Sequence, residues 1–131
     1  MTIELLYALI GAAGGTLFIY STKQFTNPET VLSVGLLVAA AVYIVFSLLW
    51  GDLGWTATEV GGVLLYSLFY VAGRKYDFRW VGAGWLLHPL WDAVLHIYGA
   101  GHFFTPFWYG WVCVGFDVLV GVYILAVYRR H

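Results

Sequence analysis

The chain has 131 residues, of which 62% are hydrophobic and only 10% are charged. A soluble domain has an apolar share of about 45–50%, so this composition excludes an ordinary soluble protein and predicts a membrane protein. The formal net charge is −1 and no long basic stretch is present, which gives no reason to expect nucleic acid as a partner. Cys113 is the single cysteine, so an intrachain disulfide and a cysteine-rich metal site are excluded.

Five apolar stretches predict an all-α, polytopic bundle of five transmembrane helices in a single domain, 1–131. The expected spans are approximately 5–21, 31–50, 56–73, 80–98 and 106–128. The first stretch lacks a basic segment before it and a small-residue cleavage site after it, so we interpret it as a retained span. Gly11 and Gly15 within it form a small-xxx-small pair, which favours close packing against another helix. Thr56 is the expected N-cap of the third helix.

The basic residues predict the orientation of the bundle. All of them lie in the first connection, the third connection and the C-terminal tail: Lys23, Arg74, Lys75, Arg79, Arg129 and Arg130. In a five-helix chain these three segments share one side, which the positive-inside rule places in the cytoplasm. We therefore expect a multi-pass protein of the cell membrane with its N-terminus outside and its C-terminus inside.

The fourth stretch carries three ionisable residues, His88, Asp92 and His96, at a regular spacing of four. An α-helix turns about 100° per residue, so these side chains lie within roughly 80° of one another on one face. Ionisable groups inside a membrane span are rare and mark functional sites by default. This ladder, defined as His88, Asp92 and His96, is therefore the centre of the predicted site.

Two further carboxylates are expected at matching depths. The predicted topology places Glu59 of the third span level with His96, and Asp117 of the fifth span level with His88. Imidazole and carboxylate groups from neighbouring helices are the ligand set of many bundle metal sites and suit zinc, iron or manganese. The predicted metal ligands are thus the three ladder residues with Glu59 and Asp117, in the outer half of the bilayer. Asp92 and His96 are the candidate catalytic acid and base groups.

The geometry of the ladder limits how it can hold metal. His88 and His96 are roughly 12 Å apart along the helix axis, which is too far for one ion. One half of the ladder could hold one metal, or two metals could share Asp92. The alternative is a structural hydrogen-bond network in which Asp92 accepts from Trp or Tyr donors. Cys113 fits the core better than a ligand set, whereas His102 and His131 are expected in solvent.

Pro89 follows His88 directly and removes the helical hydrogen bond to the carbonyl of Trp85, which predicts a kink. Within a membrane the freed carbonyl needs another partner or water. The kink therefore indicates either a polar cavity near His88 or a simple packing adjustment.

The C-terminal part of the chain resembles a family of small bacterial and archaeal integral-membrane proteins of unknown function. The resemblance covers roughly the last 75 residues and rests on four segments: Glu59-Val60-Gly61-Gly62, Gly84 to His96 with its His-Pro-Leu-Trp-Asp core, Pro106-Phe107-Trp108-Tyr109, and Phe116-Asp117. It implies a prokaryotic membrane location but no activity, and no residue role follows from it.

Three functions are compatible with these features. The first is an intramembrane metalloenzyme that acts on a lipid or another hydrophobic small molecule. The second is a small proton- or metal-coupled transporter, and the third is an accessory subunit of a membrane complex. The inner halves of the last three spans offer Tyr66, Ser67, Tyr70 and Tyr123 but no acid or histidine, which favours a cavity over a pathway through the membrane. We also expect a chain this small to form homo-oligomers.

Overall fold

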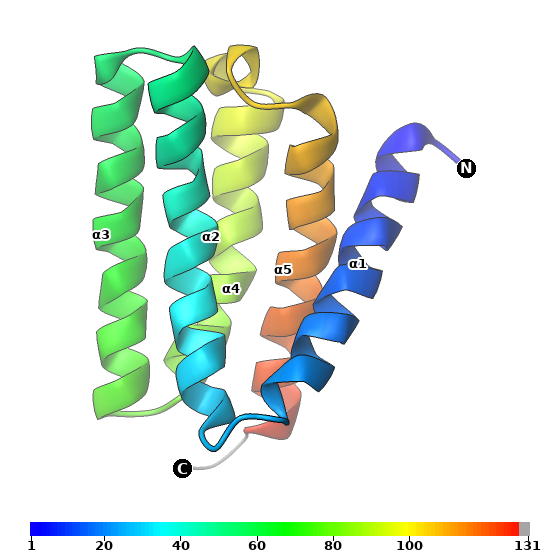
Figure 1. The fold of residues 1–131 in the computed structure, drawn as a ribbon, viewed down its shortest axis with the longest axis vertical. Coiled ribbons are helices and arrows are strands. Elements are labelled where there is room, and N and C mark those ends of the chain that lie inside the picture. Colours follow the sequence, from blue (N-terminus) through cyan, green and yellow to red (C-terminus); the bar gives the residue numbers. More distant parts are fainter. Residues whose placement is uncertain (129–131) are drawn as a thin grey trace.

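The computed structural model describes residues 1–128, and within them the secondary structure is entirely helical. Five α-helices run side by side, with α1 leaning away from the others and crossing α5 (Figure 1). The predicted all-α, five-helix architecture is confirmed, with α1 (Ile3–Thr22), α2 (Pro28–Trp50), α3 (Leu53–Lys75), α4 (Arg79–Trp91) and α5 (Phe107–Val127).

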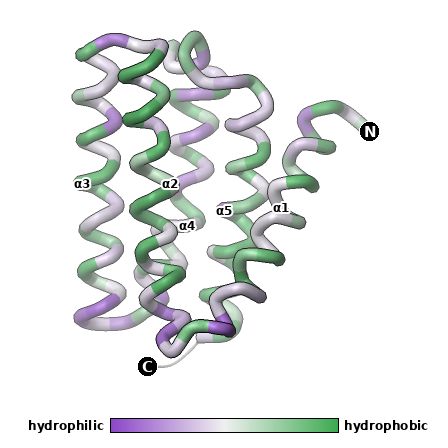
Figure 2. The backbone as a smooth tube through the Cα atoms, viewed as in Figure 1, coloured by the Kyte–Doolittle hydropathy of each residue, from purple (hydrophilic) through white to green (hydrophobic). Residues whose placement is uncertain are grey.

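Three of the helices, α1, α2 and α5, are long and apolar enough to cross a membrane. Helix α3 has a comparable length of 23 residues but a lower mean hydropathy, and α4 alone has only 13 residues. Hydrophobic residues follow the length of the bundle, while hydrophilic ones gather mainly at its two ends and along α4 (Figure 2). The fold is therefore that of a membrane-associated helical protein whose fourth helix carries hydrophilic residues along its length.

Polar side chains cap the N-termini of α2 and α3. Asn27 Oδ1 accepts a hydrogen bond from the backbone N–H of Thr30 at 3.2 Å, and Pro28 occupies the first position of α2. Asp52 Oδ1 accepts from the N–H of Trp55 at 2.8 Å. The predicted cap at Thr56 is wrong, because Asp52 already satisfies the orphan donors and its negative charge suits the positive end of the helix dipole. Glu59 consequently lies deeper in α3 than its first turn.

Helix α4 does not end at Pro89. It continues to Trp91 and passes directly into a π-helical turn, η1 (Asp92–Ile97), in which the N–H of Tyr98 bonds to the carbonyl of Ala93 at 2.9 Å. A 3₁₀ turn, η2 (Ala100–Phe103), then leads to α5. The departure from α geometry begins at Asp92 and not at Pro89 itself. Single π-turns inside helices are rare and frequently occur at functional sites.

Helices α1 and α5 pack backbone to backbone. A Cβ atom added to Gly11 would lie 1.8 Å from the carbonyl oxygen of Val112, and one added to Gly115 would lie 1.8 Å from that of Ala8. Only glycine permits this approach, so the close packing predicted for Gly11 is confirmed, with α5 as the partner.

The basic residues that the structure describes lie at one end of the bundle, where α1 joins α2 and α3 joins α4 (Figure 1). They are Lys23, Arg74, Lys75 and Arg79. Arg74 donates to Thr30 Oγ1 at 3.0 Å, and Arg79 pairs with Asp77 at 2.6 Å. We call this the basic end. The remaining basic residues of the prediction, Arg129 and Arg130, lie outside the described residues, as does His131.

The apolar core occupies the half of the bundle nearer the basic end. Leu32, Trp85 and Ile124 are almost wholly buried there, and Trp85 Nε1 donates to the carbonyl of Leu32 at 3.1 Å. The buried carboxylates and histidines of the described chain all lie between this core and the opposite end. The fold thus separates an apolar half from a half with a polar interior.

Candidate metal centre

Three side chains from two neighbouring segments meet near the middle of the bundle. His88 lies in α4, Asp92 begins η1 and Asp117 lies halfway along α5, and each is at most 1% exposed. Each offers a ligand atom within 4.8 Å of the others. Nδ1 of His88 is 2.7 Å from Oδ2 of Asp117 and 3.5 Å from Oδ2 of Asp92. We call these three residues the central cluster.

A hydrogen-bond donor to the cluster comes from α2. The phenol of Tyr43, which is fully buried, donates to Oδ1 of Asp92. Two cluster atoms remain buried without a hydrogen-bond partner, Oδ2 of Asp92 and Nε2 of His88. A buried polar atom without a partner costs about 1–3 kcal/mol, so such atoms usually indicate a bound ion or water.

The charges of the cluster do not balance within the described protein. Two carboxylates face one imidazole, while every described lysine and arginine is exposed. Carboxylates buried without a partner charge are strongly disfavoured, so either protons or a cation must neutralise them. Two ligands of one ion at bond lengths of about 2.1 Å lie roughly 3.0–3.4 Å apart. The observed separations of 2.7 and 3.5 Å bracket that range, so the cluster could hold a metal ion.

A second polar group lies closer to the end of the bundle opposite the basic end. Nε2 of His96 in η1 is 3.0 Å from Oε2 of Glu59 in α3. The other carboxylate oxygen, Oε1, accepts from Trp91 Nε1 at 3.0 Å. We call Glu59 and His96 the outer pair; both are at most 3% exposed.

The proton positions of the outer pair follow from its neighbours. Thr105 Oγ1 donates to the carbonyl of Gly101 at 3.0 Å, so its only proton is committed there. It can therefore only accept from His96, whose Nδ1 lies 2.7 Å away. This assignment puts a proton on Nδ1 and leaves Nε2 facing Glu59. The outer pair thus consists of one carboxylate and one imidazole of fixed orientation.

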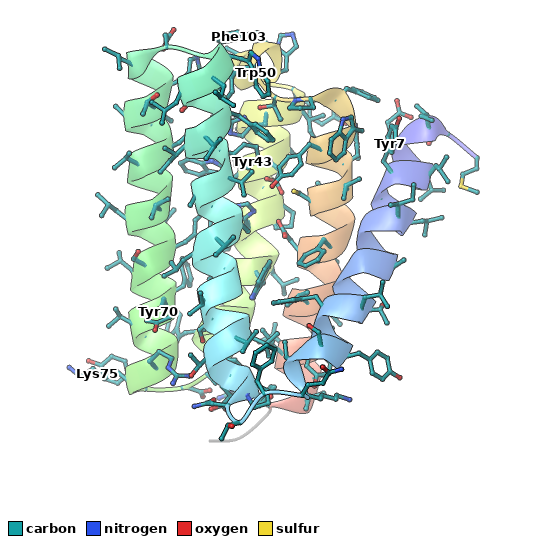
Figure 3. The ribbon with its side chains drawn as sticks, in the orientation of Figure 1. Tyr7, Tyr43, Trp50, Tyr70, Lys75 and Phe103 are labelled. Carbon is teal, nitrogen blue, oxygen red and sulfur yellow. The ribbon has the colours of Figure 1, made fainter. Side chains whose placement is uncertain are left out.

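Tyr43 connects the two groups. Its ring stacks on the ring of His96 with centroids 3.8 Å apart and an angle of 5° between planes, while its hydroxyl bonds to Asp92. Figure 3 shows Tyr43 projecting from α2 into the interior of the bundle. Its ring also makes an edge contact with Tyr109 of α5, at 5.7 Å. One side chain therefore fixes the position of an aspartate in one group and a histidine in the other.

The structure brings together three of the five predicted ligands and separates the other two. The predicted levels are confirmed, since Asp117 contacts His88 and Glu59 contacts His96. The latter contact makes a separate pair and adds no ligand to the central cluster. The catalytic roles assigned to Asp92 and His96 stay predictions. Cys113 is half-buried and His102 is exposed.

Sequence reasoning missed Tyr43 and Thr105. Tyr43 lies in a stretch otherwise composed of aliphatic and small residues and Phe46, where a tyrosine gives no sign of its partner. Thr105 directly precedes Pro106, a pattern that is typical of a helix start and gives no sign of a histidine partner. The one available signal was chemical, since Asp92 inside an apolar span requires a hydrogen-bond donor.

The comparisons with known proteins identify a family. No curated protein and no solved structure matches the chain. One family model, described as a family of unknown function, matches residues 6–130. The resemblance noted for the C-terminal part of the sequence therefore extends over almost the whole chain. This protein belongs to that family of unknown function, DUF6010.

Proposed function

We propose that this protein is a five-span membrane protein that holds one divalent metal ion at His88, Asp92 and Asp117 and uses it in a reaction on a hydrophobic substrate. The observation that carries the proposal is the unbalanced charge of the central cluster, in which two buried carboxylates flank one imidazole nitrogen. A divalent cation removes this imbalance and accepts the free lone pair of Asp92.

The five-span arrangement rests on packing. Helices α1, α2 and α5 have the length and hydropathy of spans, and α3 and α4 run alongside them (Figure 1). Helix α4 gains the missing length by continuing into η1. With the basic end in the cytoplasm, the central cluster lies near the middle of the bilayer and the outer pair lies nearer its outer face.

Labelling with an impermeant thiol reagent tests this topology. In a Cys113→Ser background, Ala100→Cys in η2 should react in intact cells, whereas Tyr76→Cys at the basic end should react only after the cells are lysed. Both positions are exposed, so accessibility to the reagent depends on the membrane alone. Labelling of Tyr76→Cys in intact cells would contradict the orientation.

The residues of the cluster have distinct tasks in this proposal. A bound divalent ion supplies Lewis acidity and lowers the pKa of a bound water. His88 and Asp117 provide ligand atoms, and the Tyr43 hydroxyl fixes Asp92 through Oδ1 so that Oδ2 stays free for the ion. The outer pair lies between the cluster and η2, where it can exchange a proton with a group at the centre.

An enzyme is favoured over a transporter by the asymmetry of the interior. Among the described residues, the contacts between buried ionisable side chains lie in the half of the bundle between η2 and the central cluster. Between the cluster and the basic end, the described residues include no buried carboxylate or histidine. A proton or metal relay across the membrane needs polar groups along its full length, and here that half is filled by the apolar core.

Elemental analysis of the purified protein tests the proposal. Protein prepared in mild detergent without chelators should contain about one equivalent of zinc, iron or manganese, and Asp117→Asn should remove it. Asp52→Asn is the matched control, because Asp52 caps α3 outside the cluster and asparagine caps a helix equally well. Wild-type protein without metal would leave the cluster as a structural hydrogen-bond network.

A further inference from the structure

An apolar pocket of about 310 Å³ lies beside the central cluster, a volume at the lower end of the range for small-molecule sites. Four helices form its wall. The wall includes Phe18 of α1, Val38 and Ala39 of α2, Trp85 of α4, and Cys113 and Asp117 of α5. Asp117 therefore belongs to both the pocket and the cluster.

The pocket exists because small side chains leave space between α2 and α5. Gly35 and Ala39 are the smallest residues of the α2 wall, which also includes Val38 and Val42, and aromatic contacts lie towards the two ends. Towards the outer pair, Phe46 and Tyr109 meet edge to face with centroids 4.9 Å apart. Towards the basic end, Phe18 packs on Phe116 at 5.5 Å. The remaining open direction is sideways, out of the bundle.

The opening faces the region where lipid chains lie. Val38 of the pocket wall is 56% exposed and sits near the middle of α2, as Asp117 does in α5. Both helices are candidate membrane spans, so an opening at this height meets hydrocarbon and not water. The lipid head groups lie more than about 10 Å away along the helix axes.

The lining of the pocket distinguishes between possible occupants. Its wall is almost wholly apolar, and it lies at the height of the middle of two candidate membrane spans. At that height the hydrocarbon chains of lipids surround the bundle, and an apolar wall matches such a chain. The polar group that the pocket reaches is the Asp117 carboxylate of the cluster.

We infer that the pocket binds the hydrocarbon chain of a membrane lipid, which enters sideways between α2 and α5 and lies against Asp117 of the central cluster. The part of the lipid next to the cluster is thus the chain interior and not the head group. A reaction of the bound lipid would need the metal site, so that part of the inference rests on the proposed function. Binding of the hydrocarbon chain itself does not depend on the metal.

Photo-crosslinking in vesicles tests the inference. The probe is a phosphatidylcholine with a diazirine near the end of one acyl chain, and crosslinked peptides are identified by mass spectrometry. Crosslinks should concentrate on the pocket segments 38–42 and 112–116, several-fold above the α3 peptide that contains Leu64. Leu64 is 65% exposed at a similar height and reports contact with bulk lipid. A diazirine next to the head group should lose this preference.

Two tryptophan variants supply the matched comparison. Val38→Trp covers the mouth of the pocket and should lower the pocket crosslinks several-fold. Val45→Trp lies about two turns farther along the same face of α2, has a similar exposure of 52% against 56%, and should leave them unchanged. Equal labelling of pocket and α3 peptides, or equal effects of the two variants, would overturn the inference. Crosslinks to a second copy of the chain would do the same.

The native cysteine gives a test without any substitution. Cys113 is the single cysteine and lines the pocket, so a membrane-permeant maleimide should modify it in delipidated protein. Added oleic acid should slow that reaction several-fold, and an unchanged rate would contradict the inference.

The metal content separates the two proposals. Asp92→Asn, at a cluster residue outside the pocket wall, should lose metal but retain the crosslinks. Wild-type protein with crosslinks but without metal would refute the proposed function and leave the pocket intact. Wild-type protein with metal but with even labelling would refute the pocket alone.

Discussion

The central cluster and the outer pair are built from the same residue types on neighbouring helices, yet they differ in charge. The outer pair combines one carboxylate with one histidine, and Trp91 and Thr105 occupy further hydrogen-bonding positions around it. The central cluster combines two carboxylates with one histidine, so one carboxylate charge has no partner charge within it. Only the outer pair can neutralise itself.

This difference shows that ionisable residues within an apolar bundle need not share one role. A balanced and hydrogen-bonded pair can stabilise a fold by joining helices, here α3 to the segment after α4. A group with excess negative charge needs a cation or protons in order to remain buried. The excess charge therefore supports the proposal that the central cluster holds a metal ion, whereas the outer pair is suited to joining helices.

Glu59→Leu should give the largest change in stability. It removes the acceptor of both His96 and Trp91, and breaking a buried pair from one side costs about 3–5 kcal/mol. We expect a lower midpoint in detergent unfolding followed by circular dichroism, with the metal content of the folded protein unchanged. Loss of metal together with stability would show that the two groups act as one site.

Tyr43→Phe should have an intermediate effect, on metal affinity. It keeps the ring that stacks on His96 but removes the hydroxyl that orients Asp92. Loss of such a supporting hydrogen bond typically weakens metal binding about 10–100-fold. Titration against a competing chelator measures this change, and Tyr109→Phe, at the edge of the Tyr43 ring, serves as the control. Equal metal affinities of the two variants would show that the Tyr43 hydroxyl does not support metal binding.

Asp92→Asn should have the smallest effect, which is a gain in the stability of the metal-free protein and not a loss. It removes one of two neighbouring carboxylates but retains an oxygen that can accept from Tyr43. Relief of like-charge repulsion should stabilise the metal-free protein by about 1 kcal/mol at neutral pH. Thermal unfolding of the stripped proteins measures it, and Glu59→Gln should not be stabilised. A destabilised Asp92→Asn would show that the cluster carries no excess charge.

The sequence predicted the heights of the polar residues well. A spacing of four places His88, Asp92 and His96 on one helical face, and the direction of each helix then sets which carboxylate lies level with which histidine. Those two rules led to the contacts of Asp117 with His88 and of Glu59 with His96. Helix-starting chemistry and apolar length likewise predicted five helices.

The group to which Asp92 belongs could not be predicted. It depends on the π-turn that begins at Asp92, and a single sequence carries no periodic signal for such a turn. It also depends on Tyr43, whose position between Asp92 and His96 follows from how α2 packs against α4. Lateral packing of this kind is a property of the tertiary structure.

The most direct test of the account compares His88→Gln with His96→Gln in one metal analysis. Both histidines are buried on the same segment of chain and each contacts a carboxylate, so the two variants differ only in which group they disrupt. With the metal at the central cluster, His88→Gln should lose it while His96→Gln retains about one equivalent. Retention of metal by His88→Gln, or its loss from His96→Gln in folded protein, would contradict a metal centre at the central cluster.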